Sequence, residues 1–257
     1  MNNNEQLNLT PFQRQEKILE YINRHSSASV KQLAEEFYLH EATVRRDLNA
    51  LAKAGQISRI HGGAAAMDAF LAEIPLFVRE TAFKEIKREI AAKAASLVKD
   101  GNTIFIDSSS TATLMIPYLK NRRSLRIVTD GIQTCMHLSK LTDAQIFCVG
   151  GCLRENSLSL IGTMAMQSLA KFHFDFAFFS CRGVSIKNGL TDTSEEEAFF
   201  REKLIECSDQ AVLLADHSKI GVNSFFNIAP FRAIDAMITD AVLCDEWHHS
   251  GVKIISP

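Results

Sequence analysis

The sequence has no run of about 18 apolar residues, so we expect no membrane-spanning helix. Its N-terminal residues lack the basic and then apolar order of a secretion signal. The six cysteines are scattered and form no Cys-x-x-Cys pair, which argues against a disulfide framework and against a zinc site. These absences predict a cytoplasmic protein with free thiols, no contact with a membrane, no bound metal and no cofactor.

The chain also lacks a strong charge of either sign, since its formal net charge is −2 over 257 residues. A protein that bound nucleic acid through a broad basic surface would be far more positive. Residues 1–65 hold eight basic side chains against seven acidic ones. Any contact with DNA must therefore come from a small focused patch, aided by a second subunit.

Residues 40–53 predict a helix with one narrow apolar face. Val44, Leu48 and Leu51 recur at i, i+4 and i+7 and so share that face. A short helix whose other faces carry small polar side chains and paired arginines fits the major groove of DNA. The alternative is an amphipathic surface helix with solvated arginines. The candidate DNA contacts on this helix are His40, Glu41, Thr43, Arg45, Arg46 and Asn49.

Two capping boxes mark the starts of two earlier helices. Thr10 and Gln13 flank Pro11, and Ser29 is followed by Gln32 at the same spacing. The second of these helices and the helix at 40–53 are joined by a tight turn, which predicts a helix-turn-helix. Residues 56–63 then alternate and end in a turn, as a β-hairpin wing does. Arg59 and His61 there are candidate contacts to phosphate or the minor groove, unless the hairpin is only solvated.

This N-terminal pattern resembles the DNA-binding signature of DeoR-family bacterial transcriptional regulators. The resemblance is carried by Arg14, by Ala-Thr-Val-Arg-Arg-Asp-Leu at 42–48 with the Leu51 that follows, and by Arg59-x-His61-Gly62-Gly63-Ala64. It implies a winged helix-turn-helix that binds double-stranded operator DNA. His40 departs from the pattern, because that family usually has a serine just before the recognition helix.

The rest of the chain predicts a second, larger domain at 78–257, after a DNA-binding domain at 1–65 and a linker at 66–77. Residues 79–99 read as one helix. Most of the apolar, β-branched runs that follow are separated by helical stretches, and this order is typical of a parallel, Rossmann-like α/β sheet covered on both faces. The runs are residues 103–106, 125–129, 145–149, 174–180, 211–215, 234–239 and 252–255.

Polar residues collect after the predicted strands, where sheets of this kind bind ligands. Consecutive hydroxyls at 108–111 before a helix favour an anion site, although serines there also cap helices. Ser194 and Glu197 have the spacing of a further capping box, so a structural role alone explains Glu197. Lys219 has an equally plain alternative, which is a lysine exposed on the surface. The candidate effector contacts are Asp107, Ser108, Ser109, Ser110, Thr111, Asp130, Gly150, Gly151, Arg154, Arg182, Asp192, Glu197 and Lys219.

Residues 75–235 also resemble the effector domain of the DeoR family. That resemblance implies a fold related to sugar-phosphate isomerases and deaminases, and a phosphorylated sugar as the effector. Ser109 and Ser110 stand where glycine and threonine are usual, and Asp130 stands where asparagine is usual. The charge of Asp130 would oppose a nearby phosphate, and we expect Arg182 to offset it.

The sequence therefore predicts a sequence-specific transcriptional regulator, a repressor of carbohydrate-metabolism genes, that is a dimer or tetramer and has no catalytic residues. One alternative is an isomerase or deaminase in which Asp192, Glu197 and Lys219 supply acid–base groups. A second is a DNA-binding or assembly protein with a vestigial pocket. The N-terminal module argues against the enzyme, which has no need of a winged helix-turn-helix.

Overall fold

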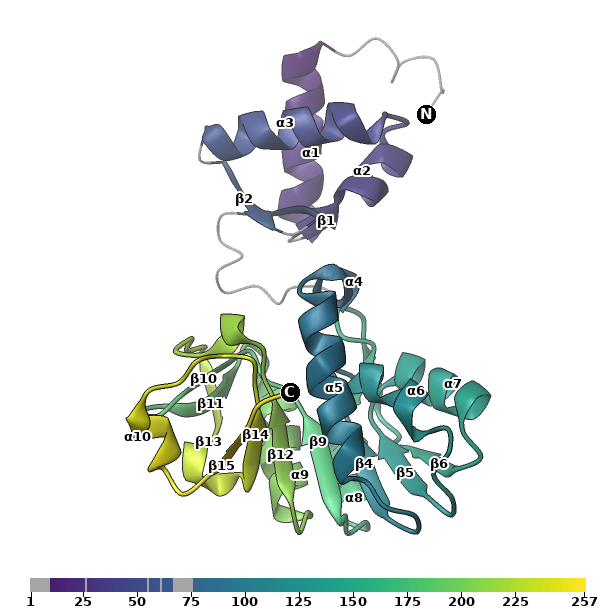
Figure 1. Ribbon diagram of the computed structural model, residues 1–257. Coiled ribbons are helices and arrows are strands. Elements are labelled where there is room, and N and C mark those ends of the chain that lie inside the picture. Colours follow the sequence, from purple (N-terminus) through teal and green to yellow (C-terminus); the bar gives the residue numbers. More distant parts are fainter. Residues whose placement is uncertain (1–9, 26, 55, 61, 67–75) are drawn as a thin grey trace. The chain divides into compact units, whose positions relative to one another are not determined.

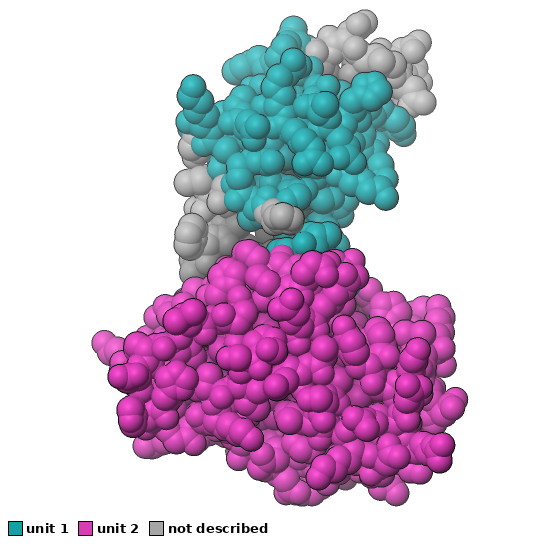
Figure 2. Space-filling view, in the orientation of Figure 1, with its two compact units in different colours: residues 1–82 teal, residues 83–257 magenta. Residues whose placement is uncertain are grey.

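The chain forms two compact units that divide between Ala82 and Phe83 (Figures 1 and 2). No helix among the residues that the structure describes is both long and apolar enough to cross a bilayer. The structure is a computed structural model, and it describes residues 10–25, 27–54, 56–60, 62–66 and 76–257.

The first unit contains the predicted helix-turn-helix. Helices α2 and α3 are joined by the four residues from Phe37 to His40, and α1 packs with them around a small core that includes Ile18, Ile22 and Leu48. Its elements are α1 (Pro11–His25), β1 (Ser27–Ser29), α2 (Val30–Glu36), α3 (Glu41–Lys53), β2 (Ile57–Ile60), β3 (Gly63–Ala66) and α4 (Leu76–Thr81).

Both predicted capping boxes of this unit are confirmed. The Thr10 hydroxyl accepts the N–H of Gln13 at 3.3 Å, and the Gln13 side chain accepts the N–H of Thr10 at 3.1 Å. Ser29 and Gln32 make the same reciprocal pair at 3.1 and 3.0 Å. Each box supplies partners for helix N–H groups that otherwise have none.

The predicted wing is present and is extended by a third strand. Strands β2 and β3 form the hairpin, and β1 pairs with β3 on its other side, giving the order β1–β3–β2. Gly63 lies so close to β1 that a Cβ atom there would be 2.2 Å from the carbonyl oxygen of Ala28. Only glycine permits this approach, so the wing depends on Gly63.

The single helix predicted for 79–99 is wrong, because the chain forms two helices there. Helix α4 ends at Thr81 and α5 (Lys84–Leu97) begins after a turn in which Phe83 has a φ of 54°. A left-handed residue cannot continue a right-handed helix, whatever the apolar period around it. The break coincides with the boundary between the two units.

The second unit is built on a seven-stranded parallel sheet, and all seven predicted strands lie in it. Its order is β15–β14–β12–β9–β4–β5–β6. The strands are β4 (Thr103–Ile106), β5 (Arg126–Thr129), β6 (Gln145–Cys148), β9 (Phe176–Phe179), β12 (Ala211–Leu214), β14 (Ala236–Ile238) and β15 (Lys253–Ile255).

Both faces of this sheet are buried, which explains why its strands read as continuous apolar runs. Phe105 and Phe179 lie in the core that α8 (Thr163–Leu169) and α9 (Glu195–Glu206) cover. Ile106 and Phe178 lie in the opposite core, under α5, α6 (Ile116–Leu119) and α7 (Ile132–Leu141) (Figure 1).

The strand order reverses between β4 and β9. From β4 the chain proceeds to β5 and β6 on one side, and it then returns to β9, β12, β14 and β15 on the other. The loops that leave two such strands diverge and open a crevice, where α/β sheets bind ligands. Asp107 follows β4 and Ser180 follows β9, so both lie at this point.

Two small antiparallel sheets, which the sequence did not predict, flank the parallel one. They are a β7–β8 ribbon and a β10–β11–β13 sheet. Their strands are short, and they carry Arg154 and Asp192, which we expected in loops. The remaining elements are β7 (Cys152–Arg154), β8 (Ser159–Ile161), β10 (Gly183–Ser185), β11 (Gly189–Asp192), β13 (Phe226–Ala229), α10 (Asp245–His248) and the 3₁₀ turns η3 (Ala112–Met115), η4 (His217–Lys219) and η5 (Phe231–Ala233).

Candidate functional site

Helix α3 presents the face that the sequence predicted. Val44, Leu48 and Leu51 are buried in the core of the first unit. The remaining positions leave a polar face available to DNA. Of the predicted contacts on and just before this helix, Thr43 is half-buried, and those that are exposed are His40, Glu41, Arg45, Arg46 and Asn49.

Asp47 is also buried on α3, and a bidentate ion pair holds it. Arg14 of α1 donates from Nε to Oδ2 at 2.5 Å and from Nη2 to Oδ1 at 3.0 Å, and Gln15 adds a hydrogen bond at 3.1 Å. The pair raises the pKa of Arg14 through its hydrogen bond to Asp47. These contacts fix the orientation of α3 on α1, so Arg14 and Asp47 are positioning residues for the recognition helix.

The wing brings a second arginine toward the recognition helix. Burial and the nearby charge of Arg45 lower the pKa of Arg59, so the two guanidinium groups lie in one positive region. Arg59 also donates to the carbonyl of Gly63 at 2.8 Å. His40 stands at the N-cap of α3 without a capping hydrogen bond from its side chain, and its ring is therefore available for another contact. His61 lies outside the described residues.

In the second unit, the predicted loop after β4 is anchored by Asp107. This carboxylate accepts the N–H of Ser109 at 3.0 Å and the N–H of Ser180 at 2.9 Å. It therefore ties the end of β4 to the end of β9 at the point where the strand order reverses. Ser109 in turn accepts the N–H of Ala112 at 3.1 Å, so this hydroxyl acts as a cap.

Ser110 and Thr111 present two backbone N–H groups that have no acceptor among the described residues. Beside them, Lys87 of α5 donates from Nζ to the Ser110 hydroxyl at 3.2 Å. Lys87 is 4 % exposed. Successive unpaired N–H groups next to a buried ammonium are suited to bind an anion.

Asp130 lies at the base of the same loop. It accepts the N–H of Ser108 at 2.8 Å and lies 3.2 Å from the Ser108 hydroxyl. Burial raises the pKa of Asp130 to about 8, and the neighbouring Asp107 carboxylate adds to the shift. A raised pKa favours the neutral form of Asp130, and this weakens the expected conflict between its charge and a phosphate.

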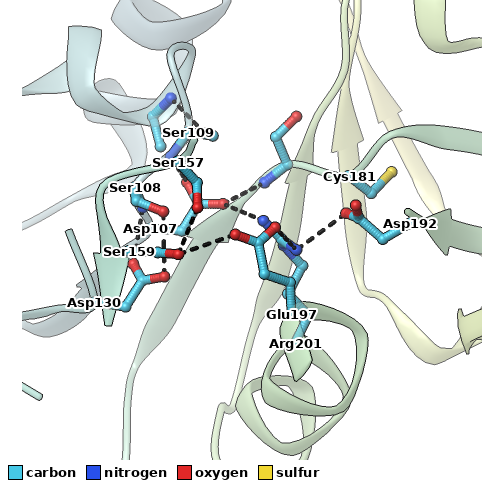
Figure 3. Close-up of polar contacts among 12 residues, drawn as sticks. Asp107, Ser108, Ser109, Asp130, Ser157, Ser159, Cys181, Asp192, Glu197 and Arg201 are labelled. Atoms are coloured by element: carbon cyan, nitrogen blue, oxygen red, sulfur yellow. Dashed lines mark hydrogen bonds and ion pairs between the residues drawn. The ribbon is translucent and has the colours of Figure 1, made fainter. Parts of the chain in front are cut away.

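A buried guanidinium organises the remaining carboxylates (Figure 3). Arg201 of α9 donates from Nη1 to Asp192 at 3.0 Å and to Glu197 at 3.1 Å, and its Nη2 lies 3.9 Å from Asp107. Burial opposes the charge of Arg201, but the carboxylates of Asp192, Glu197 and Asp107 raise its pKa well above the ordinary value. Both Asp192 and Glu197 are thus held in ion pairs.

Glu197 was predicted as an effector contact, with a capping box to Ser194 as the structural alternative, and only half of that box forms. Ser194 does accept the N–H of Glu197, at 3.4 Å, but the Glu197 side chain does not return to the cap. It accepts the Ser159 hydroxyl at 3.0 Å, and Ser159 in turn lies 2.7 Å from Ser157 (Figure 3). Arg154 of β7 approaches the same carboxylate at 3.8 Å. The β7–β8 ribbon therefore contributes directly to the site.

Lys219 also belongs to the site and is not a solvated surface lysine. It donates from Nζ to the Ser180 hydroxyl at 2.9 Å and to the carbonyl of Cys181 at 2.6 Å. Burial alone would raise the pKa of Asp216, but the charges of Lys219 and Lys87 and the bonds from Ser218 lower it below its usual range. Both lysines therefore act on one buried carboxylate.

Three predicted residues have other surroundings. Arg182 is half-exposed, and Arg201 provides the positive charge that acts on Asp130 in its place. Gly150 and Gly151 are exposed. A Cβ at Gly151 would be 2.5 Å from the carbonyl oxygen of Ile161, so this glycine permits close packing of β7 on β8.

Two family models match the chain, and they cover both units. The DeoR-like helix-turn-helix domain matches residues 14–70, and the DeoR C terminal sensor domain matches residues 83–241. The chain belongs to the DeoR family. It is therefore a helix-turn-helix transcriptional regulator with a C-terminal sensor domain.

The curated relatives extend over nearly the whole chain. The uncharacterized HTH-type transcriptional regulator YulB of Bacillus subtilis is 38 % identical over 231 residues, which are 90 % of this chain and 89 % of the relative. The glycerol-3-phosphate regulon repressor of Escherichia coli K12 is 33 % identical over 229 residues, 89 % of this chain and 90 % of the relative.

Among solved structures, ribose 5-phosphate isomerase A of Methanocaldococcus jannaschii shares 20 % identity at a TM-score of 0.40, covering 53 % of this chain and 54 % of that one. The delta subunit of eIF2B from Chaetomium thermophilum shares 16 % at a TM-score of 0.42, covering 63 % of this chain and 57 % of the other.

Several sensor-domain contacts of this DeoR-family chain were not singled out from the sequence. Arg201 was detectable, because it follows Glu197 at i+4 on a helix, where opposite charges meet. Ser157 and Ser159 gave no signal, since they belong to an unpredicted ribbon. Lys87 and Asp216 were also missed, since a single lysine and a single aspartate carry no local signal for a contact with the effector.

Proposed function

We propose that this DeoR-family regulator is a repressor of carbohydrate-metabolism genes that senses a phosphorylated sugar and catalyses no reaction on it. The phosphate binds at residues 108–111, and the sugar extends toward the carboxylates around Arg201. The observation that carries the proposal is the pair of unpaired N–H groups of Ser110 and Thr111 beside Lys87 Nζ, at the point where the strand order reverses. The names of two relatives, the glycerol-3-phosphate regulon repressor of Escherichia coli K12 and the repressor GlcR of Bacillus subtilis, agree with it.

The ion pairs of Arg201 favour sensing over catalysis. A general base for sugar isomerisation needs a carboxylate whose pKa suits proton transfer and whose lone pairs face the substrate. Asp192 and Glu197 each use one carboxylate oxygen in an ion pair with Arg201. These carboxylates are suited to accept hydrogen bonds from sugar hydroxyls, and poorly suited to remove a proton from carbon.

The test is a thermal-shift screen with glycerol 3-phosphate, fructose 1-phosphate and ribose 5-phosphate, each paired with its unphosphorylated counterpart. A ligand that binds only the native state raises its melting temperature. We expect a phosphorylated compound to do so and its counterpart not to. Proton NMR of the same mixtures should show no product, and turnover would overturn the sensor in favour of an enzyme.

Ser110→Ala sharpens the test. It removes the hydroxyl that accepts from Lys87 and lies beside the unpaired N–H groups. Losing a hydrogen bond to a charged group costs about 1.5–3 kcal/mol, which is about ten- to a hundredfold in affinity for the phosphorylated compound. Ser250→Ala, at a hydroxyl that bonds to Trp247 near the C-terminus, is the matched control and should bind as the wild type does. Equal affinity in the Ser110 variant would exclude this phosphate position.

A cytoplasmic location and a homo-oligomeric state are part of the same proposal. The six cysteines are free, as expected in a reducing compartment. A near-neutral chain with one helix-turn-helix gains affinity for DNA when two copies bind related half-sites.

A further inference from the structure

Phe83 is the first residue of the second unit, and its backbone is strained. Its φ of 54° and ψ of 34° place it in the left-handed region, where a bulky side chain is rarely found. Residues held in such conformations persist only when their surroundings fix them, and they cluster at switches. Two contacts fix Phe83, and each leads into the sensor site.

The first contact runs through helix α5. The carbonyl of Phe83 accepts the N–H of Lys87 at 3.0 Å, which makes Phe83 the start of the turn that carries Lys87. The Lys87 ammonium in turn bonds to Ser110 beside the unpaired N–H groups. A movement of Lys87 toward a bound anion therefore pulls on the turn that begins at Phe83.

The second contact runs through the 3₁₀ turn η4. The Phe83 ring meets the His217 ring edge-on, with 4.9 Å between centroids and 73° between planes. Asp240 holds His217 through its backbone N–H at 2.8 Å and through Nδ1 at 2.6 Å. Lys219, which bonds to Ser180 and Cys181 in the site, lies in the same turn.

We propose that the Phe83–His217 contact is the link through which the sensor site controls the DNA-binding unit. The inference rests on the proposed function, because it assumes that the site takes an anionic ligand. The dihedral angles of Phe83 set the direction in which the chain enters the second unit. A ligand that draws Lys87 and Lys219 inward displaces both supports of Phe83 and favours a different backbone conformation there. Such a ligand shifts the DNA-binding equilibrium by its differential affinity for the two conformations.

A double-mutant cycle on DNA affinity tests the link without any effector. The proteins are full-length Phe83→Ala, His217→Ala and the double variant, and the probe is a duplex that the wild-type chain enriches from a random-sequence library. Both substitutions break the same contact. We therefore expect each to alter the affinity for the DNA duplex by about fivefold or more, and we expect the double variant to have the same affinity as either single variant. Tyr118→Ala, at a ring with 48 % exposure against 44 % for Phe83, is the control and should not alter it.

His217→Ala breaks the same ring contact without changing Phe83 itself, so the contact is tested even if replacing Phe83 impairs folding. Two results would overturn the link. One is a His217→Ala variant that binds the DNA duplex as tightly as the wild type does. The other is a double variant whose change in DNA affinity equals the sum of the two single changes.

A second arm adds the three phosphorylated compounds of the thermal-shift screen. A compound that binds the wild type and changes its DNA affinity should bind Phe83→Ala equally well and leave its DNA affinity unchanged. If Phe83→Ala binds the compound and still responds fully, the link is wrong while the proposed sensor stands. If none of the compounds binds the wild type, the proposed sensor of phosphorylated sugars fails, and the double-mutant cycle still decides the link.

Discussion

Arg14 and Asp47, 33 residues apart in sequence, form a bidentate ion pair that joins the first helix to the recognition helix. Asp47 is 1 % exposed. The position of the DNA-reading side chains therefore depends on a charge pair inside the domain that never meets the DNA.

Asp47→Ala should destabilise the first unit by about 3–5 kcal/mol, because it leaves the guanidinium of Arg14 without its partner at a largely buried position. Urea denaturation of the full chain, followed by circular dichroism, measures the loss. The matched control is Glu41→Ala, which breaks the exposed pair with Arg45 and should cost only about 0.3–0.5 kcal/mol. Equal effects of the two changes would refute the positioning role of Asp47.

Arg45→Ala and Arg46→Ala should each weaken binding to the selected DNA duplex while leaving the melting temperature of the protein unchanged. Both side chains are exposed beside the buried face of α3. Loss of a base contact costs about 1–3 kcal/mol and relaxes specificity at that base, whereas loss of a phosphate contact shallows the salt dependence. Fluorescence anisotropy at several salt concentrations separates the two. Lys140→Ala, on the exposed side of α7, should bind as the wild type does.

Asp130 should make the stability of the protein depend on pH. Its folded pKa of about 8 lies above the ordinary value of 3.8, so the folded state binds the proton more tightly than the unfolded state does. Stability from this group is full below about pH 4 and is lost as pH rises toward 8, by at most about 1.4 kcal/mol per pH unit. The Asp130→Asn variant has no carboxyl group at this position and so does not lose this stability as pH rises. The free energy of unfolding of the variant, relative to the wild type, should therefore increase between pH 5 and pH 8, and a constant difference would contradict the assignment.

Arg201→Met should destabilise the second unit strongly, by about 3–5 kcal/mol, since it removes the guanidinium that pairs with the buried carboxylates of Asp192 and Glu197. Glu202→Ala, at an exposed position on the same helix, serves as the control. Thermal unfolding of both variants checks the prediction. A small loss in Arg201→Met would mean that the carboxylates accept protons instead, and the loss should then grow as pH rises.

The working species should be at least a dimer. Analytical ultracentrifugation of the free chain and of its complex with the selected duplex tests this expectation. A monomer that binds the duplex as tightly as an oligomeric repressor does would refute it.

The sequence predicted the elements whose pattern is local. The seven central strands follow from apolar runs, and the capping boxes at Thr10 and Ser29 follow from spacing. The break at Phe83 was missed, because the contacts that hold this residue in the left-handed region come from distant His217 and from α5. The β7–β8 ribbon was missed because strands of three residues are too short for a period to emerge.

The site shows the same division. Asp107 and the hydroxyls after β4 were predicted from their position behind a strand. The role of Arg201 depends on Asp107 and Asp192 as well as on Glu197 of its own helix, and Asp107 and Asp192 reach it only when the sheet is formed. The raised pKa of Asp130 depends on burial, which no spacing in the sequence encodes.

The central strand pair also has a consequence for the order of folding. Ile104 of β4 pairs with Phe176 of β9, so more than seventy further residues must be synthesised after Ile104 before this pair can form. The helices of the first unit need only local contacts and close their core much earlier in synthesis. The recognition helix is therefore expected to form on the ribosome before the sheet does, and a nascent chain at that stage carries the DNA-binding fold without a sensor site.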